Sequence, residues 1–352
     1  MPDKIFKTCQ QLLRILRNRG VNIPVGYAAS RAMRVLEKEN YYNVVNGYKD
    51  LFLAQLPTAI TEEQYKPNTT FDEIHALYEF DREARIIYLK YILKLENHFK
   101  TVVAHHFSEQ YGYRNYLKLE NFQHTATAVQ RELQGIARSK GWDVHRDITK
   151  INQLSVTQNL SNVNRLLGDI QHEISRQFNN NHSAITHYMR THGYIPLWVL
   201  MNVLTFGKVT AFYSNLKPTD KDTIAREFKL TAQELHKYMS MLGLARNICA
   251  HDERFFSIRF RFKLHTKSIR KFNVLQLPRE PHSNSYIQGI GDAYALAIIF
   301  AQLLPKSDIR EFISSMERAF KKLDKKISTV SLSDVQTKMG YHSSWKNLVD
   351  LY

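Results

Sequence analysis

Apolar residues recur every three to four positions over long stretches of this sequence. Glycine and proline are scarce, with 13 and 9 among 352 residues. This spacing is typical of amphipathic helices. It predicts helices over residues 8–19, 27–39 and 231–250, one long helix over 71–111, and an apolar helix that begins after Pro196. The chain is therefore predicted to be mainly α-helical.

One segment departs from the helical period. From Phe256 to Leu264 apolar and polar residues alternate, and most of the polar ones are basic, which predicts a half-buried β-strand or a hairpin over about residues 256–277. Eight Lys or Arg residues and no acid lie between Glu253 and Glu280. The basic face is either a solvent-exposed strand edge whose charges prevent pairing with other strands or a surface that binds the phosphates of a nucleic acid. Its candidate RNA-binding residues are Arg259, Arg261, Lys263, Lys267, Arg270 and Lys271.

The pattern also suggests how the chain is divided. Residues 1–65 are predicted to form a small helical unit, and residues 56–73 have a linker-like composition. Residues 66–305 are predicted to form the main helical domain, which contains the strand-like insertion, and residues 306–352 a helical tail. The first unit has a basic face that is either solvated or an RNA contact, formed by Arg14, Arg17, Arg19, Arg31 and Arg34.

Composition narrows the class of protein. Hydrophobic residues make up 43% of the chain, so a folded core is expected. The net charge of +16 favours a polyanionic partner such as nucleic acid. Two distant cysteines and no signal-peptide pattern predict a reducing, cytoplasmic location without a disulfide framework or zinc cluster. The longest apolar run, residues 293–304, is too short to span a bilayer and is interpreted as a buried helix, so no membrane partner is expected.

Candidate chemistry appears in the stretch LARNICAHDERFF, residues 244–256, where an apolar helix ends in Arg246, Asn247 and His251. Histidine can move a proton near neutral pH, arginine can hold a phosphate, and asparagine can orient either group. RNA carries its own nucleophile, the 2′-hydroxyl, so such groups can cut it without a metal or cofactor. The spacing alone is a weak signal, because five Arg–His pairs in this sequence share it within a residue or two.

Helical geometry raises a question about this site. Asn247 and His251 are four residues apart and share a helical face, whereas Arg246 points about 140° away from His251. If the helix continues through His251, the arginine must fold back or a second copy must complete the site. A break in the helix would be the other solution.

The stretch RNICAHDERFF resembles the signature of Abi-like proteins, the abortive-infection family. LYEFDREARIIYLKYILKLE and HYMRTHGYIPLWVLMNVLTFGKVTAFYSNL resemble further family segments, and the resemblance covers nearly the whole chain. It implies a HEPN-type helical bundle, a metal-independent ribonuclease site at Arg246 and His251, a homodimer, and a structured small RNA as partner. It also implies a distant relation to type VI CRISPR effectors. Asn202 stands where the family usually has Glu, and Asp252 replaces a second His.

These observations lead to three hypotheses. The first is a HEPN endoribonuclease in antiphage defence, with His251 as general acid/base, Arg246 on the phosphate and Asn247 as an orienting group. The second is a non-catalytic RNA-binding protein that forms a complex with a small non-coding RNA. The third is a DNA-binding regulator that acts through the first sixty residues.

Overall fold

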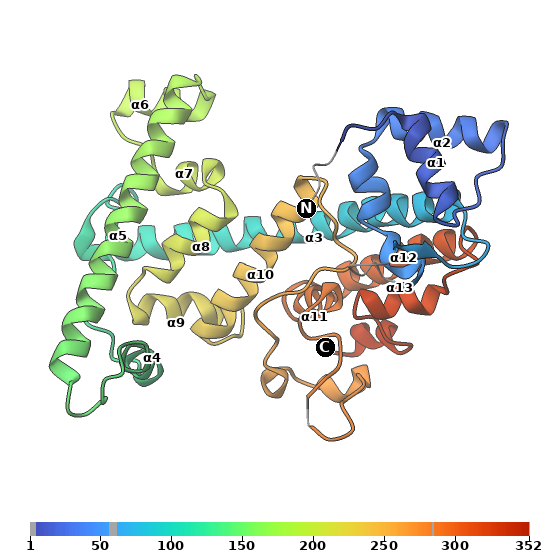
Figure 1. Ribbon diagram of the computed structural model, residues 1–352. Coiled ribbons are helices and arrows are strands. Elements are labelled where there is room, and N and C mark those ends of the chain that lie inside the picture. The colour runs from blue at the N-terminus through green and yellow to red at the C-terminus, as the bar shows by residue number, and fades with distance from the viewer. Residues whose placement is uncertain (1–4, 56–61, 284, 352) are drawn as a thin grey trace. The chain divides into compact units, whose positions relative to one another are not determined.

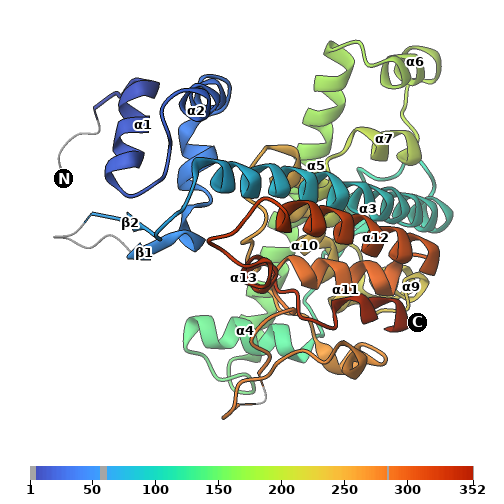
Figure 2. The same cartoon turned by 90° about the vertical axis from the view of Figure 1, so that its right-hand side faces the viewer.

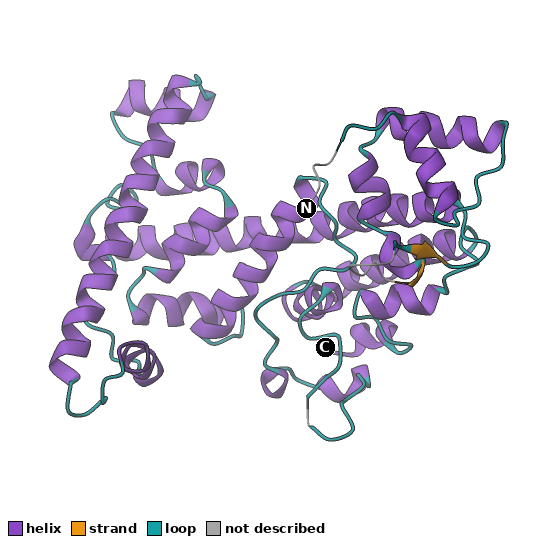
Figure 3. Cartoon of the chain, viewed as in Figure 1, coloured by secondary structure: helices purple, strands orange, loops and turns teal. Residues whose placement is uncertain are grey.

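The computed structural model describes residues 5–55, 62–283 and 285–351, and helices dominate it (Figures 1 and 3). The prediction of a mainly α-helical protein is confirmed. The chain forms two compact units. Unit 1 contains Met1–Ile92 and Leu244–Tyr352, and unit 2 contains Leu93–Gly243. These units do not follow the boundaries expected from the sequence, since the first 65 residues and the 306–352 tail belong to one unit.

Unit 1 begins with two short helices, α1 (Cys9–Asn18) and α2 (Tyr27–Lys38), close to the predicted bounds. Thr8 starts α1 with a capping box, because its hydroxyl accepts from the Gln11 amide and Gln11 returns a bond to the Thr8 amide. A π-helical turn (Tyr42–Asn46) and a 3-10 turn (Lys49–Leu51) follow. Strands β1 (Leu53–Gln55) and β2 (Gln64–Tyr65) then pair antiparallel. Residues 56–61 of the linker-like segment lie outside the described residues.

Helix α3 (Phe71–Tyr111) has the predicted bounds, and its first half is the centre of unit 1. Around it pack α11 (Ala293–Leu303), α12 (Lys306–Asp324), α13 (Leu332–Lys338) and a 3-10 segment (Trp345–Leu351) (Figure 2). Tyr88 of α3 is fully buried, and its ring lies 5.2 Å from that of Phe312 and 5.7 Å from that of Phe300. Its hydroxyl donates to the Ala293 carbonyl at 3.0 Å. The core of this unit is therefore largely aromatic.

The apolar run at 293–304 forms the buried helix α11, as the sequence predicted. Asp292 caps it, accepting hydrogen bonds from the amides of Ala295 and Gly289. Gly340 passes so close to this carboxylate, with φ of +86°, that a Cβ at that position would overlap it. The glycine is thus required by both its backbone conformation and its neighbour.

Unit 2 contains the second half of α3 and further helices. They are α4 (Gln130–Lys140), α5 (Ile148–Asn179), α6 (Ser183–His192), α7 (Leu197–Val203), α8 (Phe206–Ser214), α9 (Pro218–Glu227) and the first part of α10 (Ala232–Ala250). The single helix predicted after Pro196 is divided at Leu204 and Thr205, because the Thr205 hydroxyl caps α8 by accepting from the Lys208 amide. The polar stretch between α3 and α6 contains the 32-residue α5.

The strand or hairpin predicted over about residues 256–277 was wrong. This segment is irregular chain with 3-10 turns at Thr266–Ser268 and Phe272–Leu275, drawn as loop and short helix in Figure 3. The alternation of burial is present in part: Ile258, Phe260 and Leu264 are buried and the basic residues between them are exposed, but Phe262 is exposed as well. The amides of Phe260 and Leu264 bond to the carbonyls of residues 291 and 290, so scattered bonds to a loop replace a ladder. Alternating burial requires only that the chain is extended and lies against a core. It does not require that the chain pairs with another strand in a sheet.

Candidate functional site

The predicted catalytic residues lie together where α10 ends in unit 1. Arg246 is half-buried, and Asn247 and His251 are exposed. The helix ends at Ala250, and the His251 amide still donates to the Asn247 carbonyl at 3.0 Å. His251 is therefore the first residue beyond the helix but keeps the face it shares with Asn247. The regular helix thus ends directly before His251, and the chain changes direction only at Asp252.

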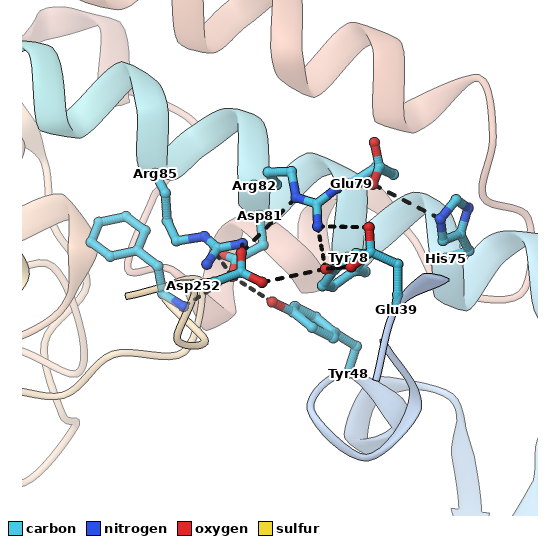
Figure 4. A network of polar contacts seen from close by, with 10 residues as sticks. Glu39, Tyr48, His75, Tyr78, Glu79, Asp81, Arg82, Arg85 and Asp252 are labelled. Atoms are coloured by element: carbon cyan, nitrogen blue, oxygen red, sulfur yellow. Dashed lines mark hydrogen bonds and ion pairs between the residues drawn. The ribbon is translucent and has the colours of Figure 1, made fainter. Parts of the chain in front are cut away.

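Asp252 ends this helix in the left-handed conformation, with φ of +57°. The Glu253 amide returns to the Ile248 carbonyl at 3.3 Å, which is the hydrogen bond of a Schellman motif. Glycine usually occupies such a position because it adopts positive φ without strain. The Asp252 side chain instead lies beside two arginines of α3, with its Oδ1 atom 2.6 Å from Arg85 Nη2 and 4.0 Å from Arg82 Nε (Figure 4). These ion pairs fix the turn that follows His251.

The chain just beyond the turn is held by a second carboxylate of α3. Asp81 is fully buried, and its Oδ2 atom accepts from the Phe255 amide at 2.9 Å and the Tyr48 hydroxyl at 2.6 Å (Figure 4). Arg85, only 2% exposed, places its Nε atom 3.9 Å from the same oxygen. Burial raises the pKa of Asp81, while the hydrogen bonds and the Arg85 charge act in the opposite direction. Asp81 and Arg85 thus anchor the polypeptide on both sides of residue 253.

The outer side of this network reaches the N-terminal helices. The Tyr78 hydroxyl donates to Glu39 at 2.9 Å and lies 3.5 Å from Asp252 Oδ2. Arg82 pairs with Glu39 at 3.0 Å and with Glu79 at 3.2 Å, and its guanidinium lies 4.7 Å from the Tyr78 ring centroid. We use the name turn anchor for Asp81, Arg85 and Asp252 together with the side chains that contact them or each other, which are Glu39, Tyr48, Tyr78 and Arg82. It connects three segments that are far apart in sequence: residues 39–48, α3 and the end of α10.

Sequence reasoning missed the turn anchor as a functional element. It noted Asp252 only as a departure from the family signature, and Asp81 and Arg85 only as matching positions. A signal was present, because Asp81 and Arg85 are four residues apart on a helix that is otherwise apolar around much of its circumference. Charges on a buried helical face need partners, and these partners prove to be Phe255 and Asp252.

The predicted RNA-binding residues all belong to unit 1, in two groups. Residues 259, 261, 263, 267, 270 and 271 are exposed on the irregular segment. Arg14, Arg17 and Arg34 are exposed on α1 and α2. Arg19 and Arg31 are engaged with carboxylates, Arg19 with the buried Glu63 at 2.5 Å and Arg31 with Asp72. Their charge is thus largely balanced within the protein, which leaves the other residues as the stronger candidates for phosphate contacts.

Two further observations concern ligands and membranes. Among the described residues, no three His, Cys, Asp or Glu side chains are grouped so that they could hold a metal ion. Within the same part of the chain, no helix has both the length and the apolar character that a bilayer crossing requires.

The fold and the site define a helical protein whose Arg–Asn–His cluster stands on an anchored helix end. Residues 34–257, which include α3, α10 and the turn after it, match the sequence profile of the family described as Abi-like protein. The chain therefore belongs to the Abi-like protein family. No curated protein and no solved structure matches it.

Proposed function

We propose that this protein is a metal-independent endoribonuclease of the HEPN type that acts in antiphage abortive-infection defence and binds a structured RNA. The observation that carries the proposal is the end of α10. There Asn247 and His251 are exposed on one face beside Arg246, and the turn anchor fixes the chain that follows. Membership of the Abi-like family supports the same assignment.

The residue types suit cleavage through the RNA 2′-hydroxyl. In this reaction the 2′-oxygen forms a bond to phosphorus, and the bond from phosphorus to the 5′-oxygen breaks. An imidazole takes the proton of the 2′-hydroxyl, and the 5′-oxygen must receive a proton as it leaves. His251 supplies the imidazole, Arg246 stabilises the charge on the phosphoryl oxygens, and Asn247 orients one of them. The products are a 2′,3′-cyclic phosphate and a 5′-hydroxyl.

A homodimer completes this scheme. One His251 cannot both accept the first proton and already carry the second, whereas two copies bring two imidazoles to one phosphate. On an α-helix Arg246 points about 140° away from the Asn247–His251 face, so it is better placed to serve a phosphate shared with a second copy. The proposed enzyme is therefore active as a pair of chains.

The exposed basic residues of the 259–271 segment supply the RNA-binding surface in this proposal. They are accompanied by no acid between Glu253 and Glu280, so the local potential is positive. Contacts of this kind release counterions from the RNA and make affinity depend strongly on salt.

The test is cleavage of total RNA in EDTA by the wild type and by Arg246→Ala, Asn247→Ala and His251→Ala. We expect the Arg246 and His251 variants to lose at least about a hundredfold in rate, as expected for a general acid/base or a charge-stabilising group. The matched control is Arg165→Ala with His172→Ala, a pair with similar spacing that is exposed on α5. Equal cleavage by all variants would refute the assignment.

The basic 259–271 segment also favours a second candidate, a non-catalytic protein that holds a small RNA. In that case Arg246, Asn247 and His251 contribute to affinity or folding alone. RNA that copurifies with the protein distinguishes the two. Intact RNA with unprocessed ends, together with a His251→Ala variant that folds normally and changes only in affinity, would support the binding protein.

A further inference from the structure

A strip of aromatic rings lies on unit 2, outside the site described above. It begins on α6, crosses the loop at residues 193–196 and ends at the start of α7 and at the turn after α3. Successive ring centroids are 5.5–6.0 Å apart. We call this set the aromatic strip, and its members are His187, Tyr188, His192, Tyr194, Tyr113 and Trp198.

The strip is partly open to solvent. Trp198 is 50% exposed and Tyr113 is 40% exposed, values that are high for aromatic side chains. His187 and His192 are also exposed. Each of the six rings carries a polar nitrogen or hydroxyl, and Trp198 is the only large exposed hydrophobic side chain between residues 182 and 198. An exposed hydrophobic patch that binds a protein partner or a membrane would contain leucine, isoleucine or phenylalanine instead.

The backbone beneath the strip holds it in place. The Leu197 amide donates to the Tyr113 carbonyl at 2.9 Å, and the Tyr116 hydroxyl donates to the Ile195 carbonyl at 2.9 Å. These bonds join the turn after α3 to the loop before α7. Gly193 ends α6 with φ of +74°, which lets the chain reverse so that Tyr194 continues the row. The rings are therefore displayed by a fixed scaffold and not by a free loop.

The charge around the strip is one-sided. Between Glu173 and Asp220 the sequence has no acidic residue. Arg176 and Lys208 in this stretch pair with Glu173, so their charge is balanced within the protein. Arg190 is exposed on α6 itself, and the Arg114 guanidinium lies 5.8 Å from the Tyr194 ring centroid. Rings that lie beside exposed arginines are suited to bind a polyanion that has its own aromatic groups. A nucleic acid strand with unpaired bases has this combination, because the bases stack on the rings and the phosphates face the cations.

We propose that the aromatic strip binds unpaired nucleotides of the RNA partner by stacking bases on Trp198 and Tyr113, with Arg114 and Arg190 facing the phosphates. The inference rests on the proposed function only for the identity of the polymer. It assigns to unit 2 a binding role that is independent of Arg246, Asn247 and His251. A bound strand covers the exposed faces of the two rings, so their fluorescence and reactivity report on it.

The experiment uses the full chain in a His251→Ala background, so that the RNA stays intact. Fluorescence anisotropy of a labelled 12-nucleotide polyuridylate gives the affinity. We expect Trp198→Ala and Tyr113→Ala each to weaken binding about tenfold. Trp198→Phe, which keeps a ring, should remain within about threefold of the parent. Tyr42→Ala removes an even more exposed aromatic, which belongs to unit 1, and should have no effect.

A second readout reports on stacking directly. Trp142 is partly buried and Trp345 is buried, so Trp198 is the tryptophan most open to a base. Polyuridylate should quench the tryptophan emission of the parent, and the quench should disappear in Trp198→Phe. A base-paired duplex of the same length should bind more weakly and cause little quenching.

Each result decides the proposal separately from the ribonuclease assignment. Unchanged affinity in Trp198→Ala and Tyr113→Ala, or equal binding of the duplex, would overturn it even if the enzyme cuts RNA. Binding of polydeoxythymidylate alone would exclude RNA as the occupant. A change of oligomeric state without a change of affinity would assign the strip to a protein contact. Loss of binding in both alanine variants would support the strip even if no cleavage is observed.

Discussion

Two buried carboxylates of α3 each accept hydrogen bonds from the backbone of a distant segment, but their pKa values shift in opposite directions. Asp81 is fully buried and holds the chain after α10 through Phe255. Glu73 is 3% exposed and holds residues 328 and 329, more than 250 positions away in sequence. Burial raises the pKa of Asp81. At Glu73 burial also acts to raise the pKa, but hydrogen bonds from the amides of residues 329, 328 and 70 outweigh it and lower the pKa to about 2.

The number of donors explains the difference. Both oxygens of Glu73 accept backbone N–H bonds, from Ser328 at 2.6 Å, Thr329 at 2.7 Å and Thr70 at 3.0 Å. At Asp81 only Oδ2 accepts, and no donor among the described residues bonds to Oδ1. A buried carboxylate stays ionised easily only when hydrogen bonds replace most of the water it has lost. Glu73 is therefore a satisfied anchor, whereas Asp81 depends on the nearby charge of Arg85.

Asp81→Ala should have the largest effect and would show how far the turn anchor depends on charge. It leaves the Phe255 amide and the Tyr48 hydroxyl without their acceptor and removes a carboxylate beside the buried Arg85. Breaking a buried pair in this way costs about 3–5 kcal/mol, measured as the free energy of unfolding in urea. Asp81→Asn keeps an acceptor oxygen and should cost clearly less. Equal losses in both variants would contradict the role given to the hydrogen bonds.

Glu73→Gln should have the next largest effect, with a defined pH dependence. The folded pKa of about 2 lies below the ordinary value of 4.5, so ionised Glu73 stabilises the fold above pH 4.5. This contribution, roughly 3 kcal/mol by linkage, is lost as the pH falls from 4.5 towards 2. The variant should be less stable than wild type at pH 7, and the difference should shrink in acid.

The control for this prediction is Glu83→Gln on the same helix. Glu83 is 37% exposed and pairs with Lys322 at 2.8 Å, so the change should cost at most about 1 kcal/mol. If Glu73→Gln and Glu83→Gln have the same small effect at neutral pH, the contrast between buried anchors and surface pairs fails.

The smallest effect concerns Cys249, which lies on α10 between Asn247 and His251. Burial raises the pKa of its thiol to about 12, and the charge of Asp81 acts in the same direction. At pH 8 almost none of it is thiolate, so iodoacetamide should modify Cys249 slowly in the native protein and quickly in urea. The other free cysteine, Cys9, should supply the fast phase of modification in the native protein, so Cys249→Ser should leave that phase unchanged. Two equally fast native phases would show that the environment of Asp81 does not extend to this position.

Much of the fold could be predicted because its helices obey local rules. The periodicity predicted the bounds of α3, and it predicted those of α1 and α2 to within one residue. The error at residues 256–277 has a physical cause, since alternating burial is shared by strands and by extended chain that lies on a core. The break at Thr205 depends on one capping hydroxyl inside an apolar run, a signal too small to outweigh the pattern around it.

The candidate site could be predicted only in part. Arg246, Asn247 and His251 lie close together in sequence, so residue types and family resemblance could single them out as candidates. The turn anchor was not found, because Tyr48, Asp81 and Phe255 meet only after the chain folds. The conformation of Asp252 was equally hidden, since positive φ at a residue other than glycine follows from its tertiary ion pairs. Pairing over long sequence distances leaves little trace in one sequence.

Unit 1 is built from two pieces of chain, Met1–Ile92 and Leu244–Tyr352, and this arrangement sets the order of events during biosynthesis. Tyr48 and Asp81 leave the ribosome before any residue of unit 2, while Phe255 leaves after all of them. At typical translation rates the first piece waits roughly 10–30 s for its complement. During that time its aromatic face and buried arginine have no native cover. The nascent protein therefore passes through a stage in which the core of unit 1 is incomplete and its apolar surface is exposed.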